Sequence, residues 1–135
     1  MQDTSDPIRV LYCDDDTEML STVGTYLFWY GLFVDCIGDS SQAAELTESN
    51  GYDALIISYW SYPADCMEVC KKIRSAPSGN RISILVIAPE DLEAWQYREL
   101  KENNIYFMTK FRGPEKWFGK IKAMVRNTRK DLESA

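Results

Sequence analysis

The sequence lacks histidine altogether, although it has 135 residues. This absence excludes histidine acid–base catalysis, Ser–His nucleophile pairs and Cys/His zinc sites. Basic residues are outnumbered by acidic residues, 15 against 21, and the resulting net charge of −6 argues against direct binding to nucleic acid. No apolar run approaches the roughly 20 residues that cross a bilayer, and the first residues lack the apolar stretch of a secretory signal. We therefore expect a cytoplasmic protein that makes no membrane contact.

Cysteine is scarce, with four residues at positions 13, 36, 66 and 70. Cys13 and Cys36 fall inside apolar, strand-like runs, and Cys66 and Cys70 are one helical turn apart. We expect four reduced, buried thiols, because a four-thiolate metal site would need cysteines in close pairs. A thiol-based sensor that uses Cys66 and Cys70 is a further alternative.

The chain contains five alternations of a short apolar run with a helical pattern. A clean helical face is formed by Cys66, Val69, Cys70 and Ile73, at positions i, i+3, i+4 and i+7. The central apolar runs are continuous, which is typical of strands buried on both faces. The pattern predicts strands at 8–13, 32–37, 54–57, 82–88 and 105–108, with a helix after each.

Such an alternation predicts an α/β fold, in which a parallel sheet is covered by helices on both faces. We expect one domain at 8–128, with an N-terminal tail at 1–7 and a C-terminal tail at 129–135. The fourth helix, at about 92–102, is expected to bury Trp95, and the last helix is expected to bury Phe118.

Polar residues follow several of the predicted strands. Asp14 and Asp15 come after the first strand, Ser58 closes the third, and Lys110 follows the fifth. The carboxyl ends of parallel strands share one edge of the sheet, where functional groups gather. Two carboxylates suit Mg²⁺, and a lysine would pair with them or with a phosphoryl oxygen. Taken alone, the acidic residues are more typical of a solvated helix start, but Lys110 and the five-fold alternation of elements favour a site.

Four segments stand out in chain order, namely VLYCDDD, YDALIISYW, MEVCKKIR, and YFMTKF followed by GPEKW. Together they resemble the receiver domain of two-component response regulators, over about residues 8–126. The resemblance implies a flavodoxin-like (βα)5 three-layer sandwich with the strand order 2-1-3-4-5. It also implies a role in phosphorelay signal transduction rather than enzyme catalysis, with a histidine kinase or another signalling protein as partner.

The resemblance assigns a role to individual positions. In that family an acidic pair helps to bind Mg²⁺, and it matches Asp14 and Asp15. The aspartate that accepts the phosphoryl group matches Ser58, and the Ser or Thr that senses this group matches Ile87. The conserved lysine of the family and the aromatic switch residue match Lys110 and Phe107, and Phe111 stands where a proline usually follows the lysine.

The departures from the family pattern affect the phosphoryl chemistry directly. A serine hydroxyl is a poor nucleophile without a base, and Ser58 also removes one negative charge from the metal site. Ile87 cannot hydrogen-bond to a phosphoryl oxygen. We therefore expect an atypical receiver without conventional aspartyl phosphorylation, which requires no cofactor and binds Mg²⁺ weakly, if at all, at Asp14 and Asp15. The alternative is a phosphoryl-accepting receiver that uses Mg²⁺ and Ser58, which is then a natural or an engineered replacement.

A partner surface is also implied by the resemblance. In that family the fourth helix, the fifth strand and the fifth helix often form the face that binds a partner or a second copy. Exposed aromatic side chains can anchor such a contact. The candidates on this face are Tyr97, Tyr106 and Trp117.

Overall fold

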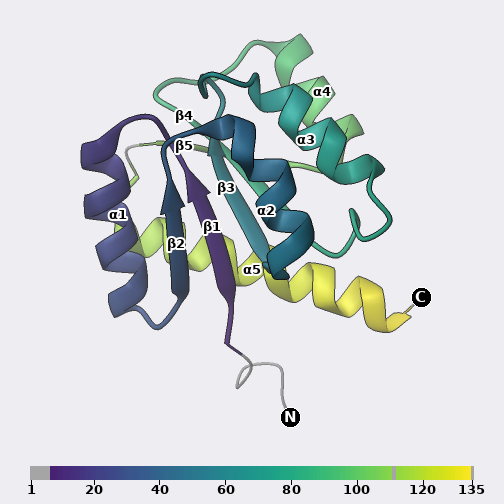
Figure 1. The fold of residues 1–135 in the computed structure, drawn as a ribbon, viewed down its shortest axis with the longest axis horizontal. Coiled ribbons are helices and arrows are strands. Elements are labelled where there is room, and N and C mark those ends of the chain that lie inside the picture. Colours follow the sequence, from purple (N-terminus) through teal and green to yellow (C-terminus); the bar gives the residue numbers. More distant parts are fainter. Residues whose placement is uncertain (1–6, 111, 135) are drawn as a thin grey trace.

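The computed structural model describes residues 7–110 and 112–134 of the chain. Strands and helices alternate along it, as the sequence predicts (Figure 1). The strands are β1 (Arg9–Cys13), β2 (Phe33–Ile37), β3 (Ala54–Ser58), β4 (Ser83–Ala88) and β5 (Tyr106–Thr109). The helices are α1 (Thr17–Trp29), α2 (Ala43–Asn50), α3 (Cys66–Ser75), α4 (Ala94–Glu102) and α5 (Pro114–Ser134), and a short 3-10 turn, η2 (Ser40–Gln42), precedes α2.

The strands form one parallel sheet in the order β2-β1-β3-β4-β5. Every residue of β3 and β4 is buried, whereas β2 at one edge is largely exposed. The continuous apolar runs of the two central strands follow from this position, because both of their faces are covered. The predicted fold class and strand order are therefore confirmed.

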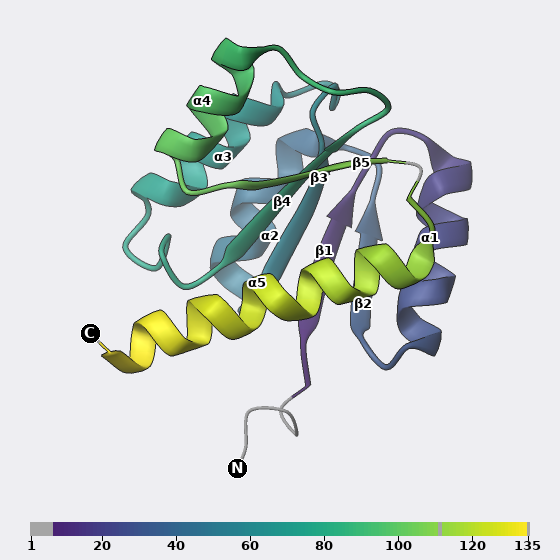
Figure 2. The same cartoon turned by 180° about the vertical axis from the view of Figure 1, so that it is seen from behind.

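Two helical layers cover the sheet. Helices α1 and α5 lie against one face, and α2, α3 and α4 lie against the other (Figures 1 and 2). Strand side chains alternate between the two layers, so Leu11 and Leu55 pack toward α3, whereas Val10 and Ile56 pack toward α5. The backbone of the sheet thus separates the two hydrophobic cores.

The ends of the helices follow local sequence signals. Asp16 caps α1 by accepting hydrogen bonds from the backbone N–H groups of Glu18 and Met19. Asp65 caps α3 in the same way. Gly31 ends the α1 segment with φ of 100°, a conformation that disfavours residues with a Cβ atom. Asp65 thus has the role of a helix cap, which is common for an acidic residue just before a helix.

Three expectations about burial are wrong or need refinement. Trp95 is 55% exposed, because α4 turns Gln96 and Leu100 inward and leaves the preceding residue facing solvent. Phe118 is half-buried and stacks on Tyr30 with ring centroids 4.9 Å apart. Cys36 is exposed because it lies on the edge strand β2, so only three of the four thiols are buried.

Helix α5 continues through Ser134, beyond position 128, which is the predicted end of the domain. Near that end, Arg129 lies 3.5 Å from Asp53 and donates a hydrogen bond to the carbonyl of Pro7. Among the described residues, no helix is both long and apolar enough to cross a membrane.

Candidate functional site

The sheet brings several predicted site residues to one edge. Cys13 pairs with Ile57, and the next residue on each strand is Asp14 and Ser58. Ser58 in turn pairs with Ile87 on β4. Strand alternation directs the side chains of this edge toward the α1 and α5 layer.

Asp14 is the centre of a buried polar network. Its carboxylate has no solvent exposure, and Lys110 is only 7% exposed. The Lys110 ammonium lies 2.9 Å from Oδ2 of Asp14, and this same oxygen accepts a hydrogen bond of 3.2 Å from the Tyr12 hydroxyl. Oδ1 accepts a bond of 3.0 Å from the backbone N–H of Asp16. The structure thus joins Asp14 and Lys110 directly, as residues of one site.

Burial beside the Asp14 charge raises the pKa values of its neighbours. The pKa of Tyr12 rises far above its ordinary value, first because the phenol is buried and then because Asp14 is close and accepts its hydrogen bond. Burial, followed by the charge of Asp14, raises the pKa of the Cys13 thiol to about 12. Both groups are therefore neutral at physiological pH.

Trp117 supports the same network from α5. Its indole N–H donates a hydrogen bond of 3.1 Å to the carbonyl of Lys110, and its ring meets the Tyr12 ring edge-on at 5.6 Å. Trp117 is 1% exposed, so its assignment as an interface candidate is wrong. Its spacing from Ile121 and Met124 was the available signal, because the three residues share one helical stripe.

The other predicted site residues differ in their surroundings. Asp15 is exposed, whereas Ser58 is 3% exposed and Ile87 is fully buried among the apolar residues under α1 and α5. Phe107 is half-buried and faces the opposite layer, where Tyr97 meets it edge-on at 5.2 Å. Phe111 lies outside the described residues.

This edge does not fit a Mg²⁺ ion well. Both carboxylate oxygens of Asp14 already accept hydrogen bonds, and the Lys110 ammonium supplies the positive charge that a metal would bring. Within residues 7–110 and 112–134, no group of three or more Asp, Glu, Cys or His side chains is arranged to hold a metal ion. Chemically, the arrangement is a neutralised ion pair rather than an open set of oxygen ligands.

The two remaining interface candidates are held in place by neighbours. The Tyr97 hydroxyl accepts a hydrogen bond from the backbone N–H of Leu92 and donates one to Asp91. Tyr106 is half-buried, and the Lys120 ammonium lies 5.3 Å from the centre of its ring. Both rings therefore present a partly exposed surface of fixed orientation.

The cysteine pair proposed for a sensor is deeply buried. Cys66 is 1% exposed and Cys70 has no exposure. A hydrogen bond with Cys70, together with burial, raises the pKa of Cys66 well above its usual value. A buried, protonated thiol reacts slowly with oxidants, so this geometry disfavours the thiol-sensor alternative.

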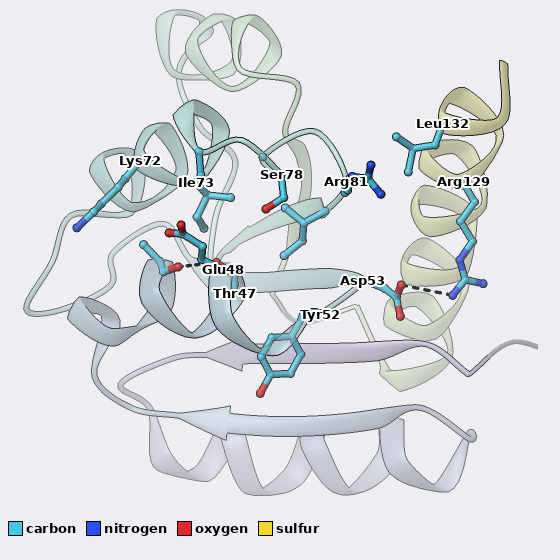
Figure 3. A pocket seen from close by; sticks show the side chains of 15 residues that line it. Thr47, Glu48, Tyr52, Asp53, Lys72, Ile73, Ser78, Arg81, Arg129 and Leu132 are labelled. Carbon is cyan, nitrogen blue, oxygen red and sulfur yellow. Dashed lines mark hydrogen bonds and ion pairs between the residues drawn. The ribbon is translucent and has the colours of Figure 1, made fainter. Parts of the chain in front are cut away.

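A separate hollow lies at the opposite edge of the sheet (Figure 3). Its volume is about 390 Å³, and it is bounded by α2, α3 and the end of α5. Asp53 and Arg129 face one another across part of it. None of the site residues predicted from the sequence lines this hollow, so it is separate from the Asp14 network.

The strand order, the two helical layers and the polar carboxyl edge define the fold of a CheY-like response-regulator receiver domain. The receiver domain of Francisella response regulator 1452 has a TM-score of 0.79 at 20% identity, over 91% of this chain and 99% of that one. A CheY-like receiver protein from Methanospirillum hungatei has a TM-score of 0.82 at 16% identity, over 93% and 99%. The receiver domain of histidine kinase PA1611 from Pseudomonas aeruginosa, with magnesium coordinated in its active-site cleft, has a TM-score of 0.79 at 18% identity, over 89% and 98%.

Curated relatives agree with this fold. The chain is 26% identical to response regulator MprA of Mycobacterium sp. (strain KMS) over 125 residues, and 27% identical to MprA of Mycobacterium leprae over 124 residues. These matches cover 93% and 92% of this chain but 54% of each relative. The chain thus spans about half the length of these relatives. No known family profile matches the chain.

Proposed function

We propose that this chain is an atypical receiver domain of a cytoplasmic two-component or phosphorelay system, which acts through protein–protein contacts without conventional aspartyl phosphorylation. The observation that carries the proposal is the buried Asp14–Lys110 ion pair beside Ser58. The similarity to response regulators supports the signalling class. Direct binding of nucleic acid and enzyme catalysis form no part of this function.

The chemistry of the edge supports a receiver that does not turn over an acyl phosphate. A phosphoryl group needs a nucleophile, and the Ser58 hydroxyl needs a base to become one. The buried carboxylate at this edge, Asp14, is already paired with Lys110 and accepts a hydrogen bond from the Tyr12 hydroxyl, so this oxygen is engaged and not free to take the Ser58 proton. Ile87 fills the strand position opposite Ser58 with an apolar side chain. No resident Mg²⁺ is needed, because Lys110 neutralises Asp14.

The face formed by α4, β5 and α5 is the proposed partner surface. Trp95 is exposed on α4, Tyr97 is half-buried on the same helix, and Tyr106 is half-buried on β5. A groove of about 560 Å³ lies along α5 near Met108 and is bordered by Lys120. Aromatic anchors beside cationic residues suit an acidic surface on a histidine kinase or another signalling protein. A homodimer through this face stays a prediction.

The second candidate function is phosphoryl acceptance at Ser58 with Mg²⁺. Its support is the place of Ser58, at the carboxyl end of β3 and one residue beyond the Cys13–Ile57 pair. In this alternative Asp14 and Asp15 would have to leave their present surroundings and share the metal. The exposed Asp15 can do so more readily than the buried Asp14.

Intact-protein mass spectrometry after incubation with acetyl phosphate and Mg²⁺ separates the two functions. We expect no gain of a phosphoryl group in the unmodified protein. Ser58→Asp restores a carboxylate nucleophile at the strand end and is the positive control for donor and buffer. Ser58→Ala is the matched variant that retains neither hydroxyl nor carboxylate.

A phosphoryl gain that maps to Ser58 and is absent from Ser58→Ala would contradict the main proposal and establish the alternative. Mg²⁺ titration followed by tryptophan fluorescence gives an independent measure. We expect a response in Ser58→Asp and at most a weak one in the unmodified protein, because the serine leaves the site one negative charge short.

A further inference from the structure

The hollow bounded by α2, α3 and the end of α5 has the size and the mixed lining of a small-molecule site (Figure 3). We call it the amino-edge pocket. Its volume of about 390 Å³ falls within the range of sites that hold small ligands. Ile73 and Ile82 belong to its wall and are almost fully buried, and Leu132 adds an exposed leucine from α5. A ligand that fills the pocket therefore contacts apolar surface on two sides.

The loop that follows α3 is a fixed wall of the amino-edge pocket. The Arg74 guanidinium donates hydrogen bonds to the carbonyls of Gly79 and Ile82 and so ties both ends of this loop to α3. Gly79 packs so closely that a Cβ atom there would collide with the carbonyl of Ile73. The loop does not have to become ordered when a ligand enters, and the cost of binding is lower for a wall that is already formed.

The charged side chains of the pocket decide the charge of its ligand. Three basic and two acidic residues line it, which gives a local net charge of +1 in a chain whose net charge is −6. Asp53 and Arg129 lie 3.5 Å apart and neutralise one another. An anion with a single charge therefore matches the pocket better than a cation or a polyanion. The five charged residues are Glu48, Asp53, Lys72, Arg81 and Arg129.

Arg81 is the side chain best placed to hold that anion. Figure 3 shows it extending from its loop toward α5. Among the described residues, its guanidinium forms no hydrogen bond or ion pair. The negative carboxyl end of α3 already has Lys72 and Arg74 in its last turn, so Arg81 is not required to compensate the helix dipole. A guanidinium fork binds carboxylates well, and Ser78 adds a hydroxyl donor to the same lining.

We propose that the amino-edge pocket binds a small organic acid with one carboxylate and an apolar body. The carboxylate pairs with Arg81 and accepts a hydrogen bond from Ser78, while the body covers Ile73, Ile82 and Leu132. A neutral apolar molecule would leave the guanidinium without a partner, and an inorganic anion would leave the apolar wall in water. Because these residues come from α3, its following loop and α5, the bound acid holds the end of α5 against the rest of the domain.

The test is an NMR titration of the isotope-labelled full chain with 2-naphthoate as the probe. We expect saturable amide shifts at Gly51, Gly79 and Leu132, which line the pocket on three elements. A dissociation constant of about 1 mM or lower is expected for a ligand of this size. The matched ligand is 2-naphthalenemethanol, which has the same rings but no charge. It should bind at least about fivefold more weakly, because it cannot pair with a guanidinium.

Two arginine variants locate the anion. Arg81→Gln should weaken the binding of naphthoate at least about fivefold and change the affinity for the alcohol less than about twofold, because the substitution removes only the charge contact. Arg98→Gln removes an exposed arginine that does not line the pocket, and it should change neither affinity. The amide spectra themselves show that both variants are folded. Bound naphthoate should also slow hydrogen exchange in the last turns of α5, as expected for a ligand held against that helix.

Each of four outcomes would overturn the proposal. Shifts that do not saturate, or that map to the α4–β5–α5 face instead, would leave the pocket without this ligand. Equal affinities for the acid and the alcohol would remove the charge contact. Unchanged binding of naphthoate in Arg81→Gln would do the same for that residue. Inorganic phosphate that binds as tightly as naphthoate would show that the apolar wall contributes nothing. None of these results depends on whether Ser58 accepts a phosphoryl group.

Discussion

At the scale of single residues, the site is governed by one buried charge and its compensation. Asp14 is sealed from solvent and is held by Lys110, Tyr12 and the backbone of Asp16. Removing two charges from water is costly, and only close pairing with further hydrogen bonds offsets that cost. Removing either partner alone should therefore lower the free energy of unfolding far more than removing both partners together.

Lys110→Met should lower the free energy of unfolding by about 3–5 kcal/mol, because Asp14 is left as an uncompensated buried charge. The double variant Asp14→Asn/Lys110→Met should recover most of this loss. Urea unfolding followed by tryptophan fluorescence measures both. A loss below about 1 kcal/mol in the single variant would mean that Asp14 is not buried as a charge.

The thiol of Cys13 makes stability depend on pH. Its folded pKa of about 12 lies above the ordinary value of 9.0, so the folded state keeps a proton that the unfolded state releases. Its contribution is therefore complete below pH 9 and is lost as pH rises toward 12, at about 1.4 kcal/mol per pH unit. Cys13→Ala should remove this part of the slope between pH 9 and 10.5 in urea titrations. An unchanged slope would contradict burial as the cause.

At the scale of elements, one arginine joins two loops at the amino edge of the sheet. Arg74, in the last turn of α3, donates to the carbonyls of Gly79 and Ile82 before β4 and to those of Asn103 and Asn104 before β5. Burial lowers its pKa, yet the planar guanidinium remains charged and reaches all four acceptors. Side-chain contacts thus fix how α3, α4 and the two following strands meet.

Arg74→Lys should therefore not be conservative. A lysine ammonium cannot bridge acceptors on both loops, and we expect a loss of about 1.5–3 kcal/mol in the free energy of unfolding. Arg98→Lys, on the exposed side of α4, is the matched control and should change stability by less than about 0.5 kcal/mol. Equal effects of the two substitutions would show that the four carbonyl contacts contribute nothing.

At the scale of the whole molecule, the sheet separates two hydrophobic cores. Both cores pack on the central strands, so neither core can be exposed there without disrupting the other. Both layers pack on β3 and β4, whose residues are buried throughout, whereas β2 and β5 lie at the edges and are partly exposed. Local opening should begin at the edges, where few buried apolar contacts must be broken.

Native-state hydrogen exchange should order the strands accordingly. We expect the backbone amides of β3 and β4 to exchange at the rate of global unfolding and those of β2 and β5 at least about tenfold faster. Exchange read by two-dimensional NMR checks the order. Amides of β2 that exchange as slowly as those of β3 would contradict edge opening and would fit a β2 edge that is covered in solution.

Much of the fold could be predicted because its signals are local. The apolar runs lie within a residue or two of the strands, and Gly31 and Asp65 end or begin helices where turn and cap residues are expected. The tryptophans were assigned in reverse, since Trp95 is exposed and Trp117 is buried. A single aromatic residue does not establish which side of a helix faces the core, whereas the full stripe through Trp117 and Ile121 does.

The sequence by itself determined the alternation of elements, the parallel sheet and the gathering of Asp14, Ser58 and Lys110 at its carboxyl edge, because periodicity and strand polarity are properties of the chain. Only the tertiary structure decided that Asp14 is paired with Lys110 and Tyr12, and that the indole of Trp117 donates to the Lys110 carbonyl from α5. These outcomes depend on distances between side chains from different elements. Packing sets those distances, and no spacing along the sequence records them.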